Sequence, residues 1–229
     1  MVKDRHVVQV LDNMIEDIID SFRHASERDS SRKEGSFSFI PKGTRSNATT
    51  FIELREWLVN KSQWSGYART AGASHFLDAG CGIGNVILTA KAAGLCRCWH
   101  GIEHLDSVYE QAVNLLRLND RCETSACSRR DRIYVQPRNR ETKVFQALKV
   151  FKGDIGTFTG YKNYDVIYYY RPFCCFDREA EFERRVEDQM KVGAILLAFY
   201  KQDYSTKRDS RFEKIPLESC PTAFIKVKD

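Results

Sequence analysis

The spacing of hydrophobic and polar positions changes near residue 73. Before that point, apolar residues recur at intervals of three and four, first from Val7 to Phe22 and again after Thr50, which is the spacing of amphipathic helices. Thr50 and Glu53 fit a capping box at the start of the second helix. The pattern therefore predicts an N-terminal helical extension over 1–72 that precedes the main domain over 73–229.

In the second domain, short apolar runs alternate with helical segments. The expected strands are 75–80, 98–103, 148–154, 164–170 and 193–199, and the expected helices are 85–94, 106–119 and 178–190. Such alternation is typical of a doubly wound α/β fold, in which helices cover both faces of a parallel sheet. Two further runs, 211–217 and 222–228, predict an antiparallel hairpin at the C-terminal end of the chain.

A glycine-rich turn follows the first expected strand in the run FLDAGCGIGN. A dinucleotide-binding turn would carry Gly or Ala where this chain has Asn85. Asp78 stands just ahead of Gly80, Gly82 and Gly84. Its carboxylate would repel a pyrophosphate by about 4 kcal/mol at a separation of about 4 Å and an effective dielectric constant of about 20. A cationic ligand fits better, and S-adenosylmethionine (SAM) carries a sulfonium and an α-ammonium group.

Two more acidic residues end the next two expected strands. Glu103 closes the second strand and Asp154 closes the third. Because the carboxyl ends of parallel strands meet at one edge of the sheet, we expect both to lie near Asp78. Glu103 would accept hydrogen bonds from both ribose hydroxyls, and Asp154 would accept one from an adenine amino group.

On these residues the sequence resembles the class I SAM-dependent methyltransferases. The match runs from about residue 76 to residue 199 and includes D-x-G-x-G at Asp78 to Gly82, the acid at Glu103 and "GD" at Gly153 and Asp154. It implies a Rossmann-like, mostly parallel, seven-stranded sheet with SAM across the carboxyl ends of its first strands. The implied cofactor-binding residues are Asp78, Ala79, Gly80, Gly82, Asn85, Glu103, His104, Asp154, Ile155 and Tyr170. DAGCGIGNVILTAKAAG followed by GIE is also similar to the non-SET histone lysine methyltransferases and their bacterial relatives.

The segment YYYRPF after the fourth expected strand resembles the N/D-P-P-Y/F motif of amino-methylating relatives. The resemblance places the catalytic acceptor site at Tyr170, Arg171 and Phe173, although Tyr170 and Arg171 replace the amide or acid and the first proline. Pro172 is expected to keep Arg171 extended. Arg171 would prefer an anionic acceptor, or it would pair within the protein with Asp177 or Glu179. The acceptor remains open between a small molecule, a protein and RNA.

The charge of the chain is concentrated in one segment. The whole chain has 36 basic and 31 acidic residues, a net charge of +5, while residues 121–143 alone have seven basic and three acidic residues, a net +4. This segment lies in an expected basic insertion over 120–147. It predicts contact with an acidic partner or nucleic acid, or else a solvated insertion.

The polar, serine-rich stretch around residues 24–50 predicts a lid over the cofactor, with Thr44 and Arg45 reaching inward. No apolar run is long enough to span a bilayer, and no signal-peptide core follows the N-terminus, so we expect a cytoplasmic protein without a membrane partner. The eight cysteines lack metal-binding spacing and are expected to be reduced thiols, with no metal site.

Two other functions fit parts of the sequence. A non-catalytic module that binds SAM or a nucleotide would explain the departures from the acceptor motif. An NAD-dependent oxidoreductase is disfavoured by Asp78 and Asn85.

Overall fold

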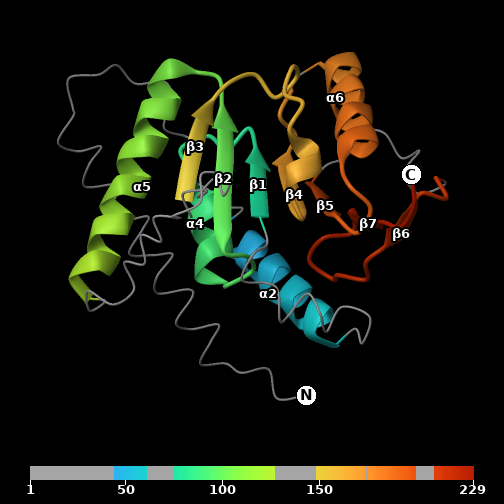
Figure 1. Cartoon of the computed structure of the whole chain (residues 1–229), viewed down its shortest axis with the longest axis horizontal. Helices are drawn as coiled ribbons and strands as arrows, with labels where there is room; N and C mark the ends of the chain where they lie inside the picture. Colours follow the sequence, from blue (N-terminus) through green and yellow to red (C-terminus); the bar gives the residue numbers. More distant parts are fainter. Residues whose placement is uncertain (1–43, 61–74, 127–147, 174, 200–208) are drawn as a thin grey trace, which may run out of the picture.

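A computed structural model describes residues 44–60, 75–126, 148–173, 175–199 and 209–229 (Figure 1). Its centre is a seven-stranded sheet with the order β3-β2-β1-β4-β5-β7-β6. The strands are β1 (His75–Ala79), β2 (Cys98–Glu103), β3 (Leu148–Lys152), β4 (Val166–Tyr170), β5 (Ile195–Phe199), β6 (Phe212–Lys214) and β7 (Ala223–Lys226). Strands β1 to β5 pair in parallel, and β7 pairs antiparallel with β5 and β6. The predicted doubly wound, Rossmann-like α/β fold and its C-terminal hairpin are confirmed.

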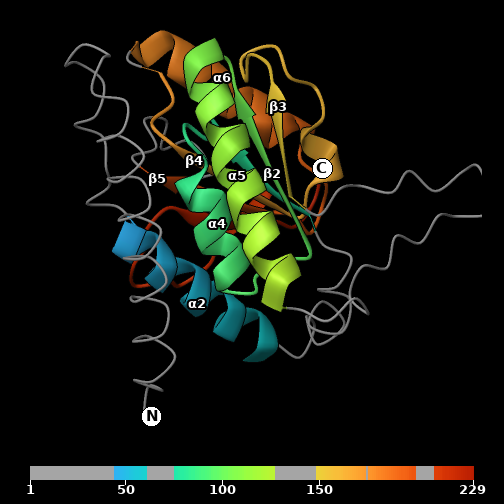
Figure 2. The same cartoon turned by 90° about the vertical axis from the view of Figure 1, so that its left-hand side faces the viewer.

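Helices cover both faces of the sheet. They are α2 (Thr44–Asn60), α4 (Asn85–Ala92), α5 (Asp106–Ala126) and α6 (Phe176–Gln189), with a short 3-10 turn, η4 (Tyr161–Asn163). Residues that alternate along β1 face opposite sides: Phe76 packs with α2 and α4, whereas Leu77 packs with α6. Figure 2 shows α2 passing alongside α4, with α5 next to α4. Because both faces are covered, the parallel strands read as nearly continuous apolar runs.

Helix α2 differs from its prediction in where it begins. It starts at Thr44, so Thr50 and Glu53 lie inside the helix and the expected capping box is wrong. The Thr50 hydroxyl donates to Ser219 Oγ at 2.8 Å, and Glu53 Oε2 accepts from the Ser219 hydroxyl at 2.7 Å and from its N–H at 3.1 Å. These polar side chains therefore fasten α2 to the loop between β6 and β7, a long-range contact that local spacing does not reveal.

The same helix contributes side chains to the core of the sheet. Phe51 and Leu54 are fully buried and join the core beneath β1, β4 and β5. The expected helix at Val7 to Phe22 and most of the expected lid lie outside the described residues. The side chains of Thr44 and Arg45 also lie outside them, so the lid stays a prediction.

Helix α5 is longer than expected. It begins at Asp106, whose carboxylate pairs with Lys152 at the end of β3, and it continues to Ala126. The expected end near Asn119 is therefore wrong, and the first residues of the expected basic insertion are helical. The remainder of that insertion, 127–147, lies outside the described residues.

The strand order locates the place where a ligand would bind. From β1 the chain moves outward in one direction to β2 and β3, whereas from β4 it moves in the other direction to β5. The direction of travel reverses between β1 and β4, and in open α/β sheets ligands usually bind at the carboxyl ends of the strands beside such a reversal. The arrowheads of β1, β2 and β3 mark this edge at the top of Figure 1.

Candidate cofactor site

The glycine turn after β1 is closed by hydrogen bonds within the protein. Gly80, Gly82 and Gly84 have φ angles of 84°, 54° and 92°, which favour glycine. The N–H groups of Gly80 and Cys81 donate to the Ile102 carbonyl, that of Gly84 donates to the Cys81 carbonyl, and that of Gly82 donates to Glu103 Oε2. A phosphate cradle needs such N–H groups to point at the ligand. These four N–H groups already donate hydrogen bonds within the protein, so they do not form a phosphate cradle.

Cys81 fills a tight space in this turn. A Cβ atom on Gly101 of β2 would lie 2.6 Å from Cys81 Sγ and 2.5 Å from Ile87 of α4, so only glycine lets the turn and the helix pack this close. Burial, and then the charges of Asp78 and Glu103, raise the pKa of the Cys81 thiol well above its ordinary value. A thiol held in its neutral form is a poor nucleophile, which supports a packing role.

Asp78 is a buried carboxyl group that lacks a full set of partners. It lies on β1 just before the turn, and the residue is 2% exposed. Its Oδ2 atom is sealed from solvent and has no hydrogen-bond partner among the described residues. Burial and the nearby charge of Glu103 raise the pKa of Asp78 well above its ordinary value. No positive charge among the described residues lowers the pKa of Asp78, and a cationic ligand would supply such a charge.

Glu103 is also buried, at 6% exposure, but its carboxylate is engaged. Oε1 accepts from the N–H groups of His104 at 2.8 Å and Leu105 at 2.9 Å, and Oε2 accepts from the N–H of Gly82 at 3.1 Å. A carboxylate has about four acceptor positions. In this conformation one position is left for a ribose hydroxyl, and the expected binding of both hydroxyls stays a prediction. The His104 side chain is largely exposed, with Nδ1 3.3 Å from Glu103 Oε1.

The ends of β1, β3 and β4 converge at Gly80. A Cβ atom at that position would lie 3.5 Å from Pro172 and 3.8 Å from the Ile155 side chain. Ile155 is buried and its carbonyl accepts from the Tyr161 hydroxyl at 2.9 Å, while Asp154 Oδ1 accepts from the Gly156 N–H at 2.8 Å. The three segments that the sequence assigned to one site are therefore neighbours.

Two other predicted cofactor residues have distinct positions. Ala79 is buried on the α6 side of the sheet, opposite Asp78, so its side chain does not face the same space. Asn85 begins α4, and its Oδ1 atom is buried without a hydrogen-bond partner among the described residues. Asn85 therefore adds a second unsatisfied polar atom near the turn.

The predicted acceptor segment does not have the expected backbone. Arg171 has a φ of 38°, a positive value that no other described non-glycine residue shares, so the expectation of an extended Arg171 is wrong. The restriction that proline imposes on the preceding residue is a local preference, and in the folded chain Pro172 lies next to Gly80 of the glycine turn. Strained backbone of this kind tends to occur at functional sites.

The three predicted acceptor residues have different neighbours. Tyr170 is half exposed and stacks on Phe199 at 6.3 Å, while Phe173 packs against Phe182 at 5.5 Å. The Arg171 charge acts on Glu179: burial and Glu183 raise the pKa of Glu179, and Arg171 opposes them. Arg171 is exposed, and both roles that the sequence left open for it stay predictions.

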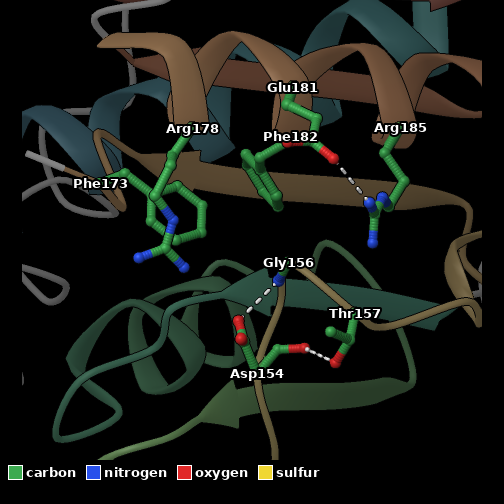
Figure 3. A pocket seen from close by; sticks show the side chains of 8 residues that line it. All are labelled: Asp154, Gly156, Thr157, Phe173, Arg178, Glu181, Phe182 and Arg185. Atoms are coloured by element: carbon green, nitrogen blue, oxygen red, sulfur yellow. Dashed lines mark hydrogen bonds and ion pairs between the residues drawn. The ribbon is translucent and has the colours of Figure 1, made fainter. Parts of the chain in front are cut away.

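A pocket of about 230 Å³ lies between the loop after β3 and helix α6 (Figure 3). Its lining consists of Asp154, Gly156, Thr157, Phe173, Arg178, Glu181, Phe182 and Arg185. Arg178 lies over the Phe173 ring at 4.9 Å, and Arg185 pairs with Glu181 at 3.1 Å. Small-molecule pockets usually measure about 300 to 1,000 Å³. This one therefore suits a single ring better than an entire nucleotide.

Other features of the described residues limit the chemistry. None of the helices there is long and apolar enough to cross a membrane, and no group of three or more His, Cys, Asp or Glu side chains is placed to hold a metal ion. The five cysteines that can be assigned there, Cys81, Cys96, Cys98, Cys175 and Cys220, are all free thiols.

Comparison with known proteins finds remote likenesses in structure. No known family model matches the sequence, and no curated protein matches it significantly. An RNA methyltransferase from Salinibacter ruber, solved with S-adenosyl-L-homocysteine, is 12% identical over 82% of this chain and 90% of its own, with a TM-score of 0.46. Magnesium protoporphyrin IX methyltransferase from Synechocystis, solved with SAM, is 13% identical over 84% of both chains, with a TM-score of 0.46. A SAM-dependent methyltransferase from Clostridium acetobutylicum is 11% identical over 65% of this chain and 49% of its own, with a TM-score of 0.41. Likenesses this remote assign neither a ligand nor an acceptor.

The structure also brings to the site residues that the sequence did not single out. Asn47 of α2 accepts a hydrogen bond from the Tyr168 hydroxyl at 3.1 Å, and Arg178 lines the pocket beside Phe173. A tyrosine within an apolar strand, such as Tyr168, is ordinarily a packing residue. Its partner could not be anticipated, because the predicted start of the helix lay beyond Asn47.

Proposed function

We propose that the protein is a SAM-dependent methyltransferase. The observation that carries the proposal is Asp78, whose carboxyl group is buried beside the glycine turn with Oδ2 unpartnered among the described residues. A buried polar atom without a partner costs about 1 to 3 kcal/mol. A ligand that brings an ammonium group would remove that cost, and the amino-acid end of SAM carries one.

The remaining residues fit the other parts of SAM. Glu103 has an acceptor position for a ribose hydroxyl, and Asp154 has a carboxylate oxygen left for an adenine amino group. Ala79, Gly80, Gly82, Asn85, His104, Ile155 and Tyr170 complete the proposed cofactor site. NAD fits less well, because the turn's N–H groups at Gly80, Cys81, Gly82 and Gly84 bond within the protein and because Asp78 would meet its phosphates.

Methyl transfer demands little chemistry from the protein. The sulfonium already activates the methyl carbon, so the enzyme has to align the acceptor with it and exclude water. No covalent protein nucleophile takes part, which agrees with the raised pKa of Cys81. The acceptor site is proposed at Tyr170, which ends β4, and at Arg171 and Phe173, which follow it at the same edge of the sheet. A small molecule, a protein or an RNA remains open as the acceptor, and contact with nucleic acid through 121–143 stays a prediction.

Titration calorimetry of the purified protein with SAM, S-adenosylhomocysteine and NAD tests the proposal. We expect both adenosyl ligands to bind and NAD not to bind. Binding of NAD alone, or of none of the three, would contradict the proposal. If SAM binds but no S-adenosylhomocysteine forms with any acceptor, the chain is a non-catalytic binding module.

A further inference from the structure

Tyr168 connects Asp78 to helix α2. In the parallel pairing of β1 and β4, Asp78 and Tyr168 are direct partners, so both side chains leave the same face of the sheet. That face is the one covered by α2 and α4, because Phe76 and Tyr168 share a core cluster with Phe51 and Leu54. The Tyr168 hydroxyl donates to Asn47 Oδ1 at 3.1 Å. Tyr168 therefore lies beside Asp78 on this face of the sheet, and its hydroxyl contacts α2.

Helix α2 is held in place firmly enough to position a side chain. Phe51 is fully buried, with its ring 5.9 Å from that of Tyr168 and 5.6 Å from that of Phe76. Glu53 and Thr50 fasten the same helix to Ser219. Asn47 itself is 6% exposed. Packing on one side and hydrogen bonds on the other thus fix the position of its amide.

The side-chain amide of Asn47 has N–H donors that can bind a ligand. Its oxygen accepts from Tyr168, and this is the one hydrogen bond that the described residues give to the side chain. A primary amide also has two N–H donors. The amino-acid end of SAM is a zwitterion, so Asp78 alone would attract its ammonium and repel its carboxylate. A site for that end needs a hydrogen-bond donor beside the acid.

We propose that Asn47, oriented by Tyr168, binds the carboxylate at the amino-acid end of the cofactor while Asp78 binds the ammonium. This inference rests on the proposed function. It places α2 at the side of the cofactor site. It also gives Tyr168 a role in orienting Asn47 in addition to its packing in the core.

The test compares two ligands that differ in the amino-acid end, which carries both the carboxylate assigned to Asn47 and the ammonium assigned to Asp78. S-adenosylhomocysteine has the amino-acid end, whereas 5′-methylthioadenosine keeps the adenosine and the uncharged sulfur but lacks that end. Titration calorimetry of the full chain would measure both ligands with Asn47→Ala, with Tyr168→Phe, and with Glu56→Ala as a control on the exposed face of α2. Thermal unfolding of each variant would check the fold.

We expect Asn47→Ala to weaken S-adenosylhomocysteine binding about tenfold, the scale of one lost hydrogen bond to a charged group. Its affinity for 5′-methylthioadenosine should match that of wild type, and Glu56→Ala should leave both affinities unchanged. Tyr168→Phe keeps the ring and should show the same selectivity with a smaller loss. Unchanged affinities in both site variants, or equal losses for both ligands, would overturn the inference. Failure of the wild-type protein to bind either ligand would instead overturn the proposed function.

Discussion

Asp78 and Glu103 sit at the ends of neighbouring strands, face the same side of the sheet and are almost equally buried, at 2% and 6% exposure. Their surroundings differ sharply. Glu103 accepts three backbone hydrogen bonds, whereas Asp78 Oδ2 has no partner among the described residues. Similar burial therefore corresponds to two different roles. Glu103 stabilises the turn through its hydrogen bonds, whereas Asp78 keeps a carboxylate oxygen with which a ligand can form a hydrogen bond.

The largest effect is expected from removing Glu103. Glu103→Ala leaves the N–H groups of Gly82, His104 and Leu105 without their acceptor. The free energy of unfolding should fall by about 2 to 3 kcal/mol, since hydrogen bonds to charged groups are worth about 1.5 to 3 kcal/mol. Urea denaturation measures the change. Asp154→Ala is the matched control, because that carboxylate accepts one exposed backbone hydrogen bond. Equal midpoints for the two variants would show that Glu103 does not hold the turn.

Replacing Asp78 should have the opposite effect on stability. Because the pKa of Asp78 is raised in the folded state, its contribution to stability is fully present below the ordinary carboxyl pKa and is lost as pH rises through the raised value. Asp78→Asn removes this loss, so at neutral pH the ligand-free variant should be more stable than wild type by about 1 kcal/mol. At acidic pH the difference should shrink. Urea titrations at both pH values measure it, and a variant less stable than wild type at neutral pH would contradict the assignment of an unsatisfied carboxyl.

A smaller effect should separate two substitutions of Arg171. Both Arg171→Ala and Arg171→Gly remove the charge that acts on Glu179, but only glycine adopts a φ of 38° without strain. The glycine variant should therefore be more stable than the alanine variant by about 0.5 to 1 kcal/mol, after the greater entropy of the unfolded glycine chain is counted. Thermal unfolding of the pair checks this. A more stable alanine variant would mean that the backbone at this position relaxes freely.

The sequence predicted the sheet well, because the alternation of short apolar runs and helical segments depends on local spacing. The positions of Asp78, Glu103 and Asp154 at strand ends also followed from that spacing. The sequence did not predict which hydrogen bonds the carboxyl groups accept. The contacts between Glu103 and the backbone N–H groups depend on the three-dimensional geometry of the backbone. The start of α2 was missed for a similar reason, because Thr50 and Glu53 bond to Ser219, far away in the chain.

The affinity for S-adenosylhomocysteine as a function of pH tests most directly whether Asp78 takes up the cationic end of the cofactor. Ionised Asp78 binds an ammonium group and protonated Asp78 does not, so binding must favour the ionised form. As pH rises above the ordinary carboxyl pKa, the wild-type affinity should rise while Asp78 loses its proton and should then level off, because burial and the charge of Glu103 raise the pKa of Asp78 in the free protein. Asp78→Asn should bind at least about tenfold more weakly where that affinity has levelled off and show no such rise. A wild-type affinity that does not change with pH, together with equally tight binding by Asp78→Asn, would contradict the central claim.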